Sequence, residues 1–368
     1  MENKIKVLHV SSPLTWRGGE QQIAYLLKGL SEAYSEIENL VVCPKASAME
    51  SYLIKEGHQY HSYKKRSGLS PSYIFGVLKS MKSFKPDIIH IHDAHAHTAV
   101  VIAHIISGSK IPVILHRRVD FHLKKSFFSR YKYEYRYIKK VLCVSNAIKD
   151  IVSQSNIESN KIEVVYSGVD PNRLKNTGAD IRKELGLDKD NILIGNVAAI
   201  ADHKDYFTFV RVIKTLCSKD VKAHGIIIGD GPQRAEIEAF VKSEKMDKNI
   251  HFLGYRNDAN SLIFNLDIFL MPSKTEGLGT SIIDAFNAGV PVVSTNAGGI
   301  AELVEHKVCG LLAEPFDHQK LAEHIISLLN SSELKQNLIS NAKAKAESFH
   351  YIKMVEKTFH IYKSILNA

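Results

Sequence analysis

Residues 272–302 read PSKTEGLGTSIIDAFNAGVPVVSTNAGGIAE, and this stretch carries the clearest indication of the fold. An apolar run at residues 268–271 comes directly before it, a second run occupies residues 291–294, and a helical pattern lies between the two. Apolar runs that alternate with helical patterns predict parallel strands joined by crossover helices. The glycines after the first run let backbone N–H groups approach an anion, and the helix N-terminus adds a partial positive charge. The stretch therefore predicts a phosphate-binding turn in a parallel α/β sheet.

The same alternation continues in both directions along the 368-residue chain, whose length suits two domains. Further strands are expected at residues 5–10, 40–43, 87–91, 112–115, 141–144, 191–197, 224–229 and 250–253. A turn-rich segment at residues 166–171 separates the two sets and suits a hinge. We therefore predict an α/β protein with two Rossmann-like, doubly wound parallel-sheet domains, residues 1–170 and 171–350, that face each other across a ligand-binding cleft.

The final helical pattern, residues 351–366, has an apolar stripe that another part of the chain must cover. The stripe consists of Ile352, Val355, Phe359, Tyr362 and Leu366. We expect this helix to cross back to the first domain.

The composition is that of a globular protein, with 45% hydrophobic and 24% charged residues. The apolar runs are far shorter than the roughly 20 residues of a membrane-spanning helix, and the N-terminus lacks the apolar segment of a signal peptide. The four cysteines are scattered without a CxxC pair, which favours buried free thiols. We therefore expect a cytoplasmic protein.

Two carboxylates frame the predicted turn. Glu276 precedes the glycines, and Asp284 lies eight residues later, roughly two turns into the helix. They can therefore reach opposite ends of one extended ligand, and carboxylates accept strong hydrogen bonds from hydroxyl groups. This arrangement suits one carboxylate for a transferred sugar and one for a nucleoside ribose. The alternative is an acidic residue that favours the helix dipole, together with a surface aspartate.

On these residues the chain resembles the retaining GT-B glycosyltransferases of family four (glycosyl transferases group 1), of the kind that builds bacterial cell-surface polysaccharide. The resemblance spans almost the whole chain. The family motif is a Glu, seven residues, a second Glu, a Gly-x-Pro-Val-Val strand and a Gly-Gly turn. The chain matches this motif at Glu276, Gly277, Gly279, residues 289–293 and residues 298–299. Asp284 departs from the second Glu, so the contact with ribose is expected to weaken or shift.

The resemblance implies a donor site in the second domain. It assigns Glu276 to the hydroxyls of the donor sugar and Asp284 to the ribose. It assigns the sugar and the diphosphate to the backbone amides of Gly277, Leu278, Gly279, Thr280 and Ser281. Lys204 matches the family lysine that neutralises the diphosphate, which suits a leaving group that gains negative charge. Without this context, Lys204 would be interpreted as a solvated loop lysine.

The family arginine that precedes this lysine is missing, because residues 196–200 are Asn-Val-Ala-Ala-Ile. Arg256 or another side chain is a candidate replacement. The alternative is a donor held by Lys204 and the helix dipole alone. Loops that contain Gly231 and Arg256 match those that line the nucleotide base pocket, although such loops are also ordinary turns at strand ends.

In the first domain, Gly18 and Gly19 follow the first predicted strand and open a helix, which predicts a second phosphate-type turn. The resemblance places this loop near the donor phosphates and the acceptor. His116 ends a predicted strand, where ligands collect in parallel sheets. It matches the family histidine that touches the donor sugar, and the alternative is a satisfied strand-end histidine. His92 belongs to a histidine pair that the family also has at this strand end.

Four histidines crowd residues 90–97, a pattern that raises the question of a metal site. They are His90, His92, His95 and His97. The first two share one strand face, whereas the other two enter a loop or helix, so their spacing does not make them converge. The family has no metal here. We therefore expect no metal and no other cofactor, with the nucleotide sugar as a substrate.

The net charge of +9 is concentrated in the first half, because residues 1–175 hold 26 Lys and Arg against 15 Asp and Glu. Basic clusters occur at residues 64–66, 117–118 and 124–125, and residues 126–140 interleave basic and aromatic side chains. Such a surface attracts either anionic lipid or nucleic acid.

Within residues 126–140, a second interpretation is a buried helix face, because apolar residues recur there at helical spacing. These residues are Phe128, Tyr131, Tyr135 and Ile138. We expect peripheral contact with an anionic membrane at the inner face of the cytoplasmic membrane, and no nucleic acid.

Together these features predict a retaining glycosyltransferase that uses His116, Lys204 and Glu276 in catalysis. It would move a hexose or N-acetylhexosamine from a UDP-sugar to a hydroxyl of a glycan or lipid-linked acceptor, as in lipopolysaccharide or exopolysaccharide synthesis. One alternative is a nucleotide-sugar 2-epimerase of similar fold. The other is a non-catalytic nucleic-acid-binding or scaffold protein, which would leave the two phosphate-type turns unexplained.

Overall fold

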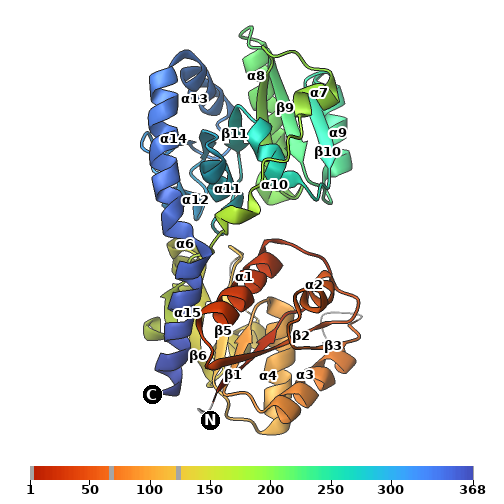
Figure 1. Cartoon of the computed structure of the whole chain (residues 1–368), viewed down its shortest axis with the longest axis vertical. Helices are drawn as coiled ribbons and strands as arrows, with labels where there is room; N and C mark the ends of the chain where they lie inside the picture. The colour runs from red at the N-terminus through yellow and green to blue at the C-terminus, as the bar shows by residue number, and fades with distance from the viewer. Residues whose placement is uncertain (1–3, 66–69, 122–125, 368) are drawn as a thin grey trace. The chain divides into compact units, whose positions relative to one another are not determined.

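The computed structural model describes residues 4–65, 70–121 and 126–367. The chain forms two compact units (Figure 1). Unit 1 comprises Met1–Gly168 with Tyr351–Ala368, and unit 2 comprises Val169–His350. The first division therefore falls after Gly168, inside the predicted turn-rich segment and slightly before residue 170, where the boundary was expected.

Unit 1 contains a seven-stranded sheet in the order β3-β2-β1-β4-β5-β6-β7. Every neighbouring pair in it is parallel. The strands are β1 (Ile5–Val10), β2 (Ile37–Pro44), β3 (Tyr60–Tyr63), β4 (Ile88–Ile91), β5 (Val113–Arg117), β6 (Ile138–Cys143) and β7 (Ile162–Val164). The strand order reverses between β1 and β4, and ligands bind at such a switch point in open parallel sheets.

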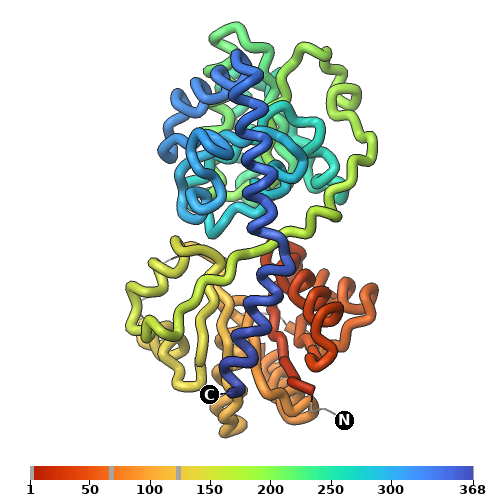
Figure 2. Tube along the Cα trace, turned by 60° about the vertical axis from the view of Figure 1, so that its left-hand side comes forward, coloured from red at the N-terminus to blue at the C-terminus, as the bar shows by residue number. Residues whose placement is uncertain are grey.

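The helices of unit 1 are α1 (Gly18–Ala33), α2 (Ala48–Glu56), α3 (Pro71–Phe84), α4 (Ala94–Ser107), α5 (Phe127–Tyr133), α6 (Asn146–Ser153) and α15 (Tyr351–Leu366). Helix α15 packs against α1, as the C-terminal end of the tube shows in Figure 2. The rings of Tyr34 and Phe359 stack at this contact, with centroids 3.7 Å apart. The C-terminal helix thus completes the core of unit 1.

The prediction of which residues of this helix are buried is correct at the centre of the stripe and wrong at its ends. Val355, Phe359 and Tyr362 are buried, whereas Ile352 is only partly buried and Leu366 is 37% exposed. The buried face also includes Tyr351, Met354, Thr358 and Ile361. The buried face of α15 is therefore wider than one row of side chains, and it is shifted from the predicted row.

Unit 2 contains a six-stranded parallel sheet in the order β10-β9-β8-β11-β12-β13. The strands are β8 (Ile192–Val197), β9 (Ala223–Ile228), β10 (Ile250–Gly254), β11 (Ile268–Met271), β12 (Val292–Thr295) and β13 (Leu311–Ala313). The α-helices are α7 (Ile181–Leu185), α8 (Tyr206–Cys217), α9 (Arg234–Ser243), α10 (Ala259–Leu262), α11 (Thr280–Ala288), α12 (Ile300–Leu303), α13 (His318–Asn330) and α14 (Ser332–Ala346). Two short 3-10 helices matter for the site, η2 (Pro171–Arg173) and η3 (Asp202–Lys204).

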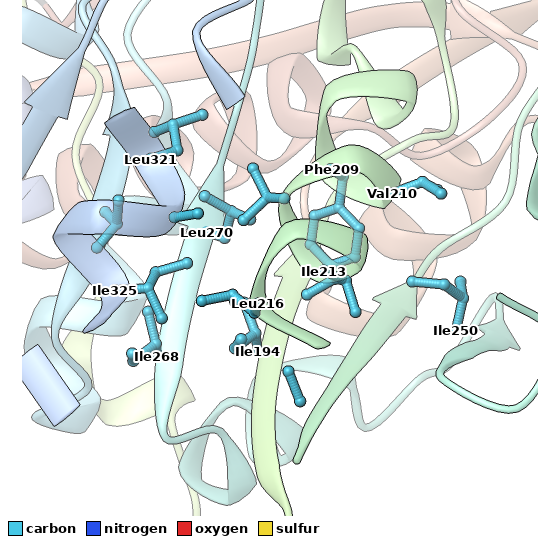
Figure 3. Close-up of a cluster of buried hydrophobic side chains, with 14 of the residues drawn as sticks. Ile194, Phe209, Val210, Ile213, Leu216, Ile250, Ile268, Leu270, Leu321 and Ile325 are labelled. Carbon is cyan, nitrogen blue, oxygen red and sulfur yellow. The ribbon is translucent and has the colours of Figure 1, made fainter. Parts of the chain in front are cut away.

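The core of unit 2 holds the two strands that carry its candidate site. Helices α8 and α13 pack against each other and against the sheet. Figure 3 shows side chains of these helices, such as Phe209, Ile213 and Leu321, gathered around Ile194 of β8 and Leu270 of β11. The apolar contacts therefore fix β8 and β11, and the loops after these strands begin from a rigid base.

The prediction of an α/β protein with two Rossmann-like parallel sheets is confirmed. All of the predicted strands are present. The strands that were not predicted, β3, β7 and β13, are each the edge of a sheet. Among the described residues, no helix combines the length and apolar character that crossing a bilayer requires. The four cysteines are free, and three of them are buried.

Candidate active site

The predicted phosphate-binding turn lies between β11 and α11. Gly279 is the N-cap of α11 and has a φ of +88°, a conformation that glycine adopts without side-chain strain. The first N–H groups of a helix have no partner within the helix, and no side chain of the described residues caps this end. The amides of Thr280 and Ser281 therefore lie at a helix N-terminus, which favours a bound anion.

A second glycine turn, between β12 and α12, holds this loop in place. A Cβ on Gly298 would lie 2.3 Å from the carbonyl oxygen of Glu276, and a Cβ on Gly299 would lie 2.2 Å from that of Gly277. The N–H of Gly299 donates to the Glu276 carbonyl at 2.9 Å. The two glycines thus permit a backbone-to-backbone contact that fixes where Glu276 sits.

Gly298→Ala is expected to lower the free energy of unfolding of unit 2 by roughly 3 kcal/mol, because a strained φ of +52° adds to a clash with backbone. Gly186→Ala is the matched control in the same unit. Gly186 has a φ of +66°, but a Cβ there would meet nothing within 4 Å, so the cost should be only about 1 kcal/mol. Urea denaturation followed by circular dichroism measures both. Equal losses of unfolding free energy in the two variants would contradict the proposal that the backbone contacts of Gly298 and Gly299 hold the loop of Glu276 in place.

Lys204 and Glu276, two of the three predicted catalytic residues, lie together in unit 2. Lys204 ends η3, and its Nζ forms a salt bridge with the carboxylate of Glu276. The two side chains are only 13% and 15% exposed. The N–H of Lys274 donates to the carbonyl of His203 at 2.8 Å, which ties η3 to the loop before α11. A cation and a carboxylate thus share one partly buried position on two joined loops.

Asp284 lies inside unit 2 rather than on an open surface. Its side chain on α11 is buried, and Arg173 of η2 binds the carboxylate through Nε and Nη2, with an Nε–Oδ1 distance of 3.0 Å. Burial raises the pKa of the Asp284 carboxyl, and the Arg173 guanidinium opposes that rise. A guanidinium therefore already occupies the carboxylate that was assigned to ribose. The ribose contact stays a prediction, and it requires ribose to share this carboxylate with Arg173.

Sequence reasoning missed Arg173. It lies 111 residues from Asp284 and belongs to no motif, so only the folded chain brings the two together. The available signal was indirect: an aspartate replaces the longer glutamate of the motif, which leaves space beside α11 for a further side chain.

The loops after β9 and β10 carry the residues assigned to a base pocket. Gly231 packs closely on the loop after β8, since a Cβ on it would lie 2.3 Å from the carbonyl oxygen of Ile200. Arg256 binds Asp258 through Nε at 2.8 Å and Glu184 through Nη1 at 2.9 Å. These contacts do not favour Arg256 as the replacement for the missing phosphate-binding arginine. Lys204 and the N-terminus of α11 remain as the electropositive elements of the predicted phosphate site.

In unit 1, Gly18 and Gly19 form the first turn of α1 directly after the loop that follows β1. A Cβ on Gly18 would meet nothing within 4 Å, and a Cβ on Gly19 would meet only Cδ of Arg118, at 3.9 Å. Packing within the described residues therefore does not require glycine at either position. Open space at a helix N-terminus is consistent with the predicted approach of a ligand.

Four buried histidines gather at the carboxyl ends of the central strands of unit 1. They are His9 of β1, His90 of β4, His92 directly after β4 and His116 of β5. The rings of His90 and His116 are stacked, with centroids 5.6 Å apart. Burial lowers the pKa of all four, that of His9 to about 4, so the rings are neutral at physiological pH. His9 was not predicted, although its parallel partner across the sheet is His90.

Ring nitrogens of His9, His90 and His92 lie within 4.8 Å of one another, which is close enough to consider a metal ion. Both nitrogens of His9 are hydrogen-bonded, to His92 and to Asn39, each at 3.0 Å. The guanidinium of Arg118 lies beside His92. A cation would have to break these hydrogen bonds next to a partly buried positive charge. The donor set therefore fits a metal poorly, and the expectation of no metal stays a prediction.

The basic and aromatic segment at residues 126–140 is not one helix. Helix α5 ends at Tyr133, and the buried Tyr135 and Ile138 lie beyond it. Phe127 and Phe128, at the start of α5, are each 81% exposed. The interpretation of this segment as one buried helical stripe is therefore wrong, because the stripe crosses from a helix into the next strand.

The basic clusters differ in how they contribute to the surface. Arg117 is buried and donates to the hydroxyl of Tyr133 at 2.6 Å, and Arg118 contacts the buried histidines, so this pair adds little to an exposed basic surface. Arg66 and residues 124–125 lie outside the described residues. Arg130 of α5 is exposed, and its Nε forms a salt bridge with Glu134 at 3.7 Å.

Two family models match the chain. The model described as "Glycosyltransferase Family 4" matches residues 16–173, and the model described as "Glycosyl transferases group 1" matches residues 178–345. Each model matches somewhat less than half of the chain, and together the two models match most of it.

Two relatives match over most of their own length. An "Uncharacterized glycosyltransferase MJ1178" of Methanocaldococcus jannaschii is 29% identical over 318 residues, with 84% of each chain covered. The Escherichia coli "UDP-Gal:alpha-D-GlcNAc-diphosphoundecaprenol alpha-1,3-galactosyltransferase" is 24% identical over 306 residues, with 78% of each chain covered. The solved structure of Anabaena Alr3699/HepE in complex with UDP and glucose has a TM-score of 0.84 at 22% identity and covers 98% of this chain and 100% of that one. The last similarity concerns the fold.

Proposed function

We propose that this chain, a member of the family 4 glycosyltransferases with the GT-B fold, transfers a hexose or N-acetylhexosamine from a UDP-sugar. The acceptor in this proposal is a hydroxyl group of a glycan or lipid-linked saccharide, and the anomeric configuration is retained. The observation that carries the proposal is the Lys204–Glu276 pair beside the open N-terminus of α11.

Each element of this site suits one part of a nucleotide-diphosphate sugar. The ammonium group of Lys204 and the N–H groups at the start of α11 suit the diphosphate, which gains negative charge as the glycosidic bond breaks. The carboxylate of Glu276 suits sugar hydroxyls, which donate strong hydrogen bonds to an anionic oxygen. The site thus stabilises charge and orients the sugar.

The pairing of Lys204 with Glu276 describes the ligand-free site. Each residue neutralises the other, which limits the cost of holding two charges in a partly buried position. Donor binding exchanges this salt bridge for two new contacts, lysine with diphosphate and glutamate with sugar. Any ligand that supplies only one of these groups leaves the other residue without a partner, so the pair favours an intact nucleotide sugar.

In the proposed reaction, the bond between the anomeric carbon and the phosphate oxygen breaks while the acceptor oxygen attacks the same face. The acceptor proton passes to the departing phosphate oxygen, which takes the bonding electron pair. Lys204 and the amides of α11 stabilise the charge of the leaving diphosphate. We assign His116 of unit 1 to a hydrogen bond with a sugar.

A lipid-linked acceptor is supported by two observations. The name of the E. coli relative gives a diphosphoundecaprenol-linked acceptor for that protein. In this chain, Phe127 and Phe128 are exposed at the start of α5 with Arg130 nearby, a combination that suits an anionic membrane surface. We therefore propose peripheral contact with an anionic membrane through α5.

Thermal unfolding of the purified protein with UDP-, GDP- and ADP-sugars in EDTA tests the donor, because a ligand that binds only the folded state raises the midpoint. We expect a shift with a UDP-sugar that is lost in Glu276→Ala and only reduced in Lys204→Ala, because Lys204 acts mainly on the charge of the departing diphosphate. A shift that needs a divalent cation would contradict the metal-free proposal. Conversion of the UDP-sugar to an epimer without acceptor would favour an epimerase, and no shift with any nucleotide sugar would favour a non-catalytic protein.

A further inference from the structure

Arg118 follows β5 directly and contacts two of the buried histidines. Its Nη2 lies 3.1 Å from Nδ1 of His116 and 3.3 Å from Nδ1 of His92, and its Nη1 donates to the carbonyl of His92 at 3.2 Å. A guanidinium has donors and no acceptor. Each Nδ1 that faces it must therefore offer a lone pair, so a neutral His92 and a neutral His116 both carry their proton on Nε2.

The charges around Arg118 support this assignment. Burial lowers the pKa of Arg118 to about 10, against the opposing influence of Glu20 and Asp93. The guanidinium therefore stays protonated at neutral pH. Burial and the positive charge of Arg118 lower the pKa of His92 and His116, so both rings stay neutral. The guanidinium thus faces two neutral rings and acts only as a donor.

The hydrogen bonds beyond His92 agree with the same placement of protons. Nε2–H of His92 donates to Nδ1 of His9 at 3.0 Å, which leaves the proton of His9 on Nε2. That Nε2–H donates in turn to Oδ1 of Asn39 at 3.0 Å. One set of tautomers therefore satisfies every contact from Arg118 to Asn39.

Among the described residues, the chain of hydrogen bonds leaves two buried groups without a partner, Nε of Arg118 and Nε2 of His116. Nε2 of His116 is buried and has no hydrogen-bond partner among the described residues. A buried N–H without an acceptor costs free energy, so such groups mark places where a ligand or water completes the site.

We infer that Arg118 is a positioning residue that fixes His116 as an Nε2–H donor, so that His116 recognises an acceptor oxygen of a sugar and does not accept a proton in the reaction. The identity of the ligand as a sugar rests on the proposed function. The tautomer of His116 does not, because it is a property of the free protein.

Nitrogen-15 NMR of the imidazole rings in the ligand-free protein tests the tautomers. We expect wild-type His92 and His116 to show a protonated Nε2 and an unprotonated Nδ1. Arg118→Met should release this restriction and populate the Nδ1–H form of His116, whereas Arg118→Lys should keep the wild-type pattern because lysine still donates. Arg117→Met is the control for loss of a buried arginine, since Arg117 contacts Tyr133 and Phe121 instead. A proton on Nδ1 of wild-type His116, or the same pattern in Arg118→Met, would overturn the inference.

A double-mutant cycle tests whether Arg118 acts through His116. Arg118→Met should lower kcat/KM for the UDP-sugar roughly threefold to tenfold, the value of one hydrogen bond. In a His116→Gln background, whose amide N–H donates without help from Arg118, the same substitution should have little further effect. Equal losses in both backgrounds would assign Arg118 a separate role. If the wild type consumes no UDP-sugar, the proposed function fails, and the NMR experiment still decides the tautomer.

Discussion

Lys204→Ala is expected to lower kcat roughly 10²–10³-fold while KM for the donor rises much less. The reason is that negative charge on the leaving diphosphate grows as the transition state forms, so the contact with Lys204 is stronger there than in the ground state. The ground state also loses little, because the free enzyme gives up the salt bridge between Lys204 and Glu276 in any case. Initial rates of UDP release over a range of donor concentrations separate the two constants.

Lys274→Ala is the matched control for this prediction. Lys274 lies in the same pair of loops and forms its own salt bridge, to Asp202 at 2.6 Å, but it does not contact Glu276 through its side chain. Its removal tests the loss of a loop cation without the loss of Lys204, and kcat should stay within about threefold of the wild type. A large fall in kcat for both variants would mean that the loops, rather than the charge of Lys204, determine the rate.

The fold could be predicted because it depends on patterns that are local in sequence. The central strand β11 has the sequence IFLM, is buried at every residue and reads as a continuous apolar run. The edge strand β3 has the sequence YHSY and no fully buried residue, so it lacks that pattern. The buried face of α15 was predicted only in part. The helix that packs against α15 determines which rows of its side chains are buried, and the sequence of α15 alone does not contain that information.

The candidate site could be predicted only where a motif encodes it. The glycine turn with Glu276 is local, and Lys204 follows a recognisable strand. Arg173 contacts Asp284 and Arg118 contacts His92, which are distant from them in sequence, and His9 contacts His92 across the sheet. No spacing rule connects such residues, because parallel topology rather than chain distance brings them together.

Arg173→Ala is expected to lower the free energy of unfolding of unit 2 by roughly 3 kcal/mol, because it leaves the buried carboxylate of Asp284 without its partner. Asp284→Asn should cost less, since the Arg173 side chain that loses the carboxylate is 22% exposed and water can reach its charge. Arg173→Ala with Asp284→Asn should recover part of the loss. Urea unfolding by circular dichroism gives these values. The only tryptophan, Trp16, lies in unit 1, so its fluorescence separates the unfolding of that unit. Lys222→Ala, which breaks an exposed ion pair in unit 2, should cause no measurable change.

The pH dependence distinguishes an unpaired buried charge from simple loss of packing. Burial raises the pKa of Asp284 in the folded state, and removal of Arg173 removes an opposing influence and raises it further. A carboxyl whose folded pKa exceeds its unfolded pKa binds more protons in the folded state, so stability falls as pH rises through that interval. Relative to the wild type, the loss of unfolding free energy in Arg173→Ala should therefore become smaller as the pH is lowered from 7 towards 5. The loss in the double variant should stay constant. If the loss of unfolding free energy in Arg173→Ala does not change with pH, Asp284 is protonated or solvated without Arg173. The charge of Asp284 would then not hold η2 against α11.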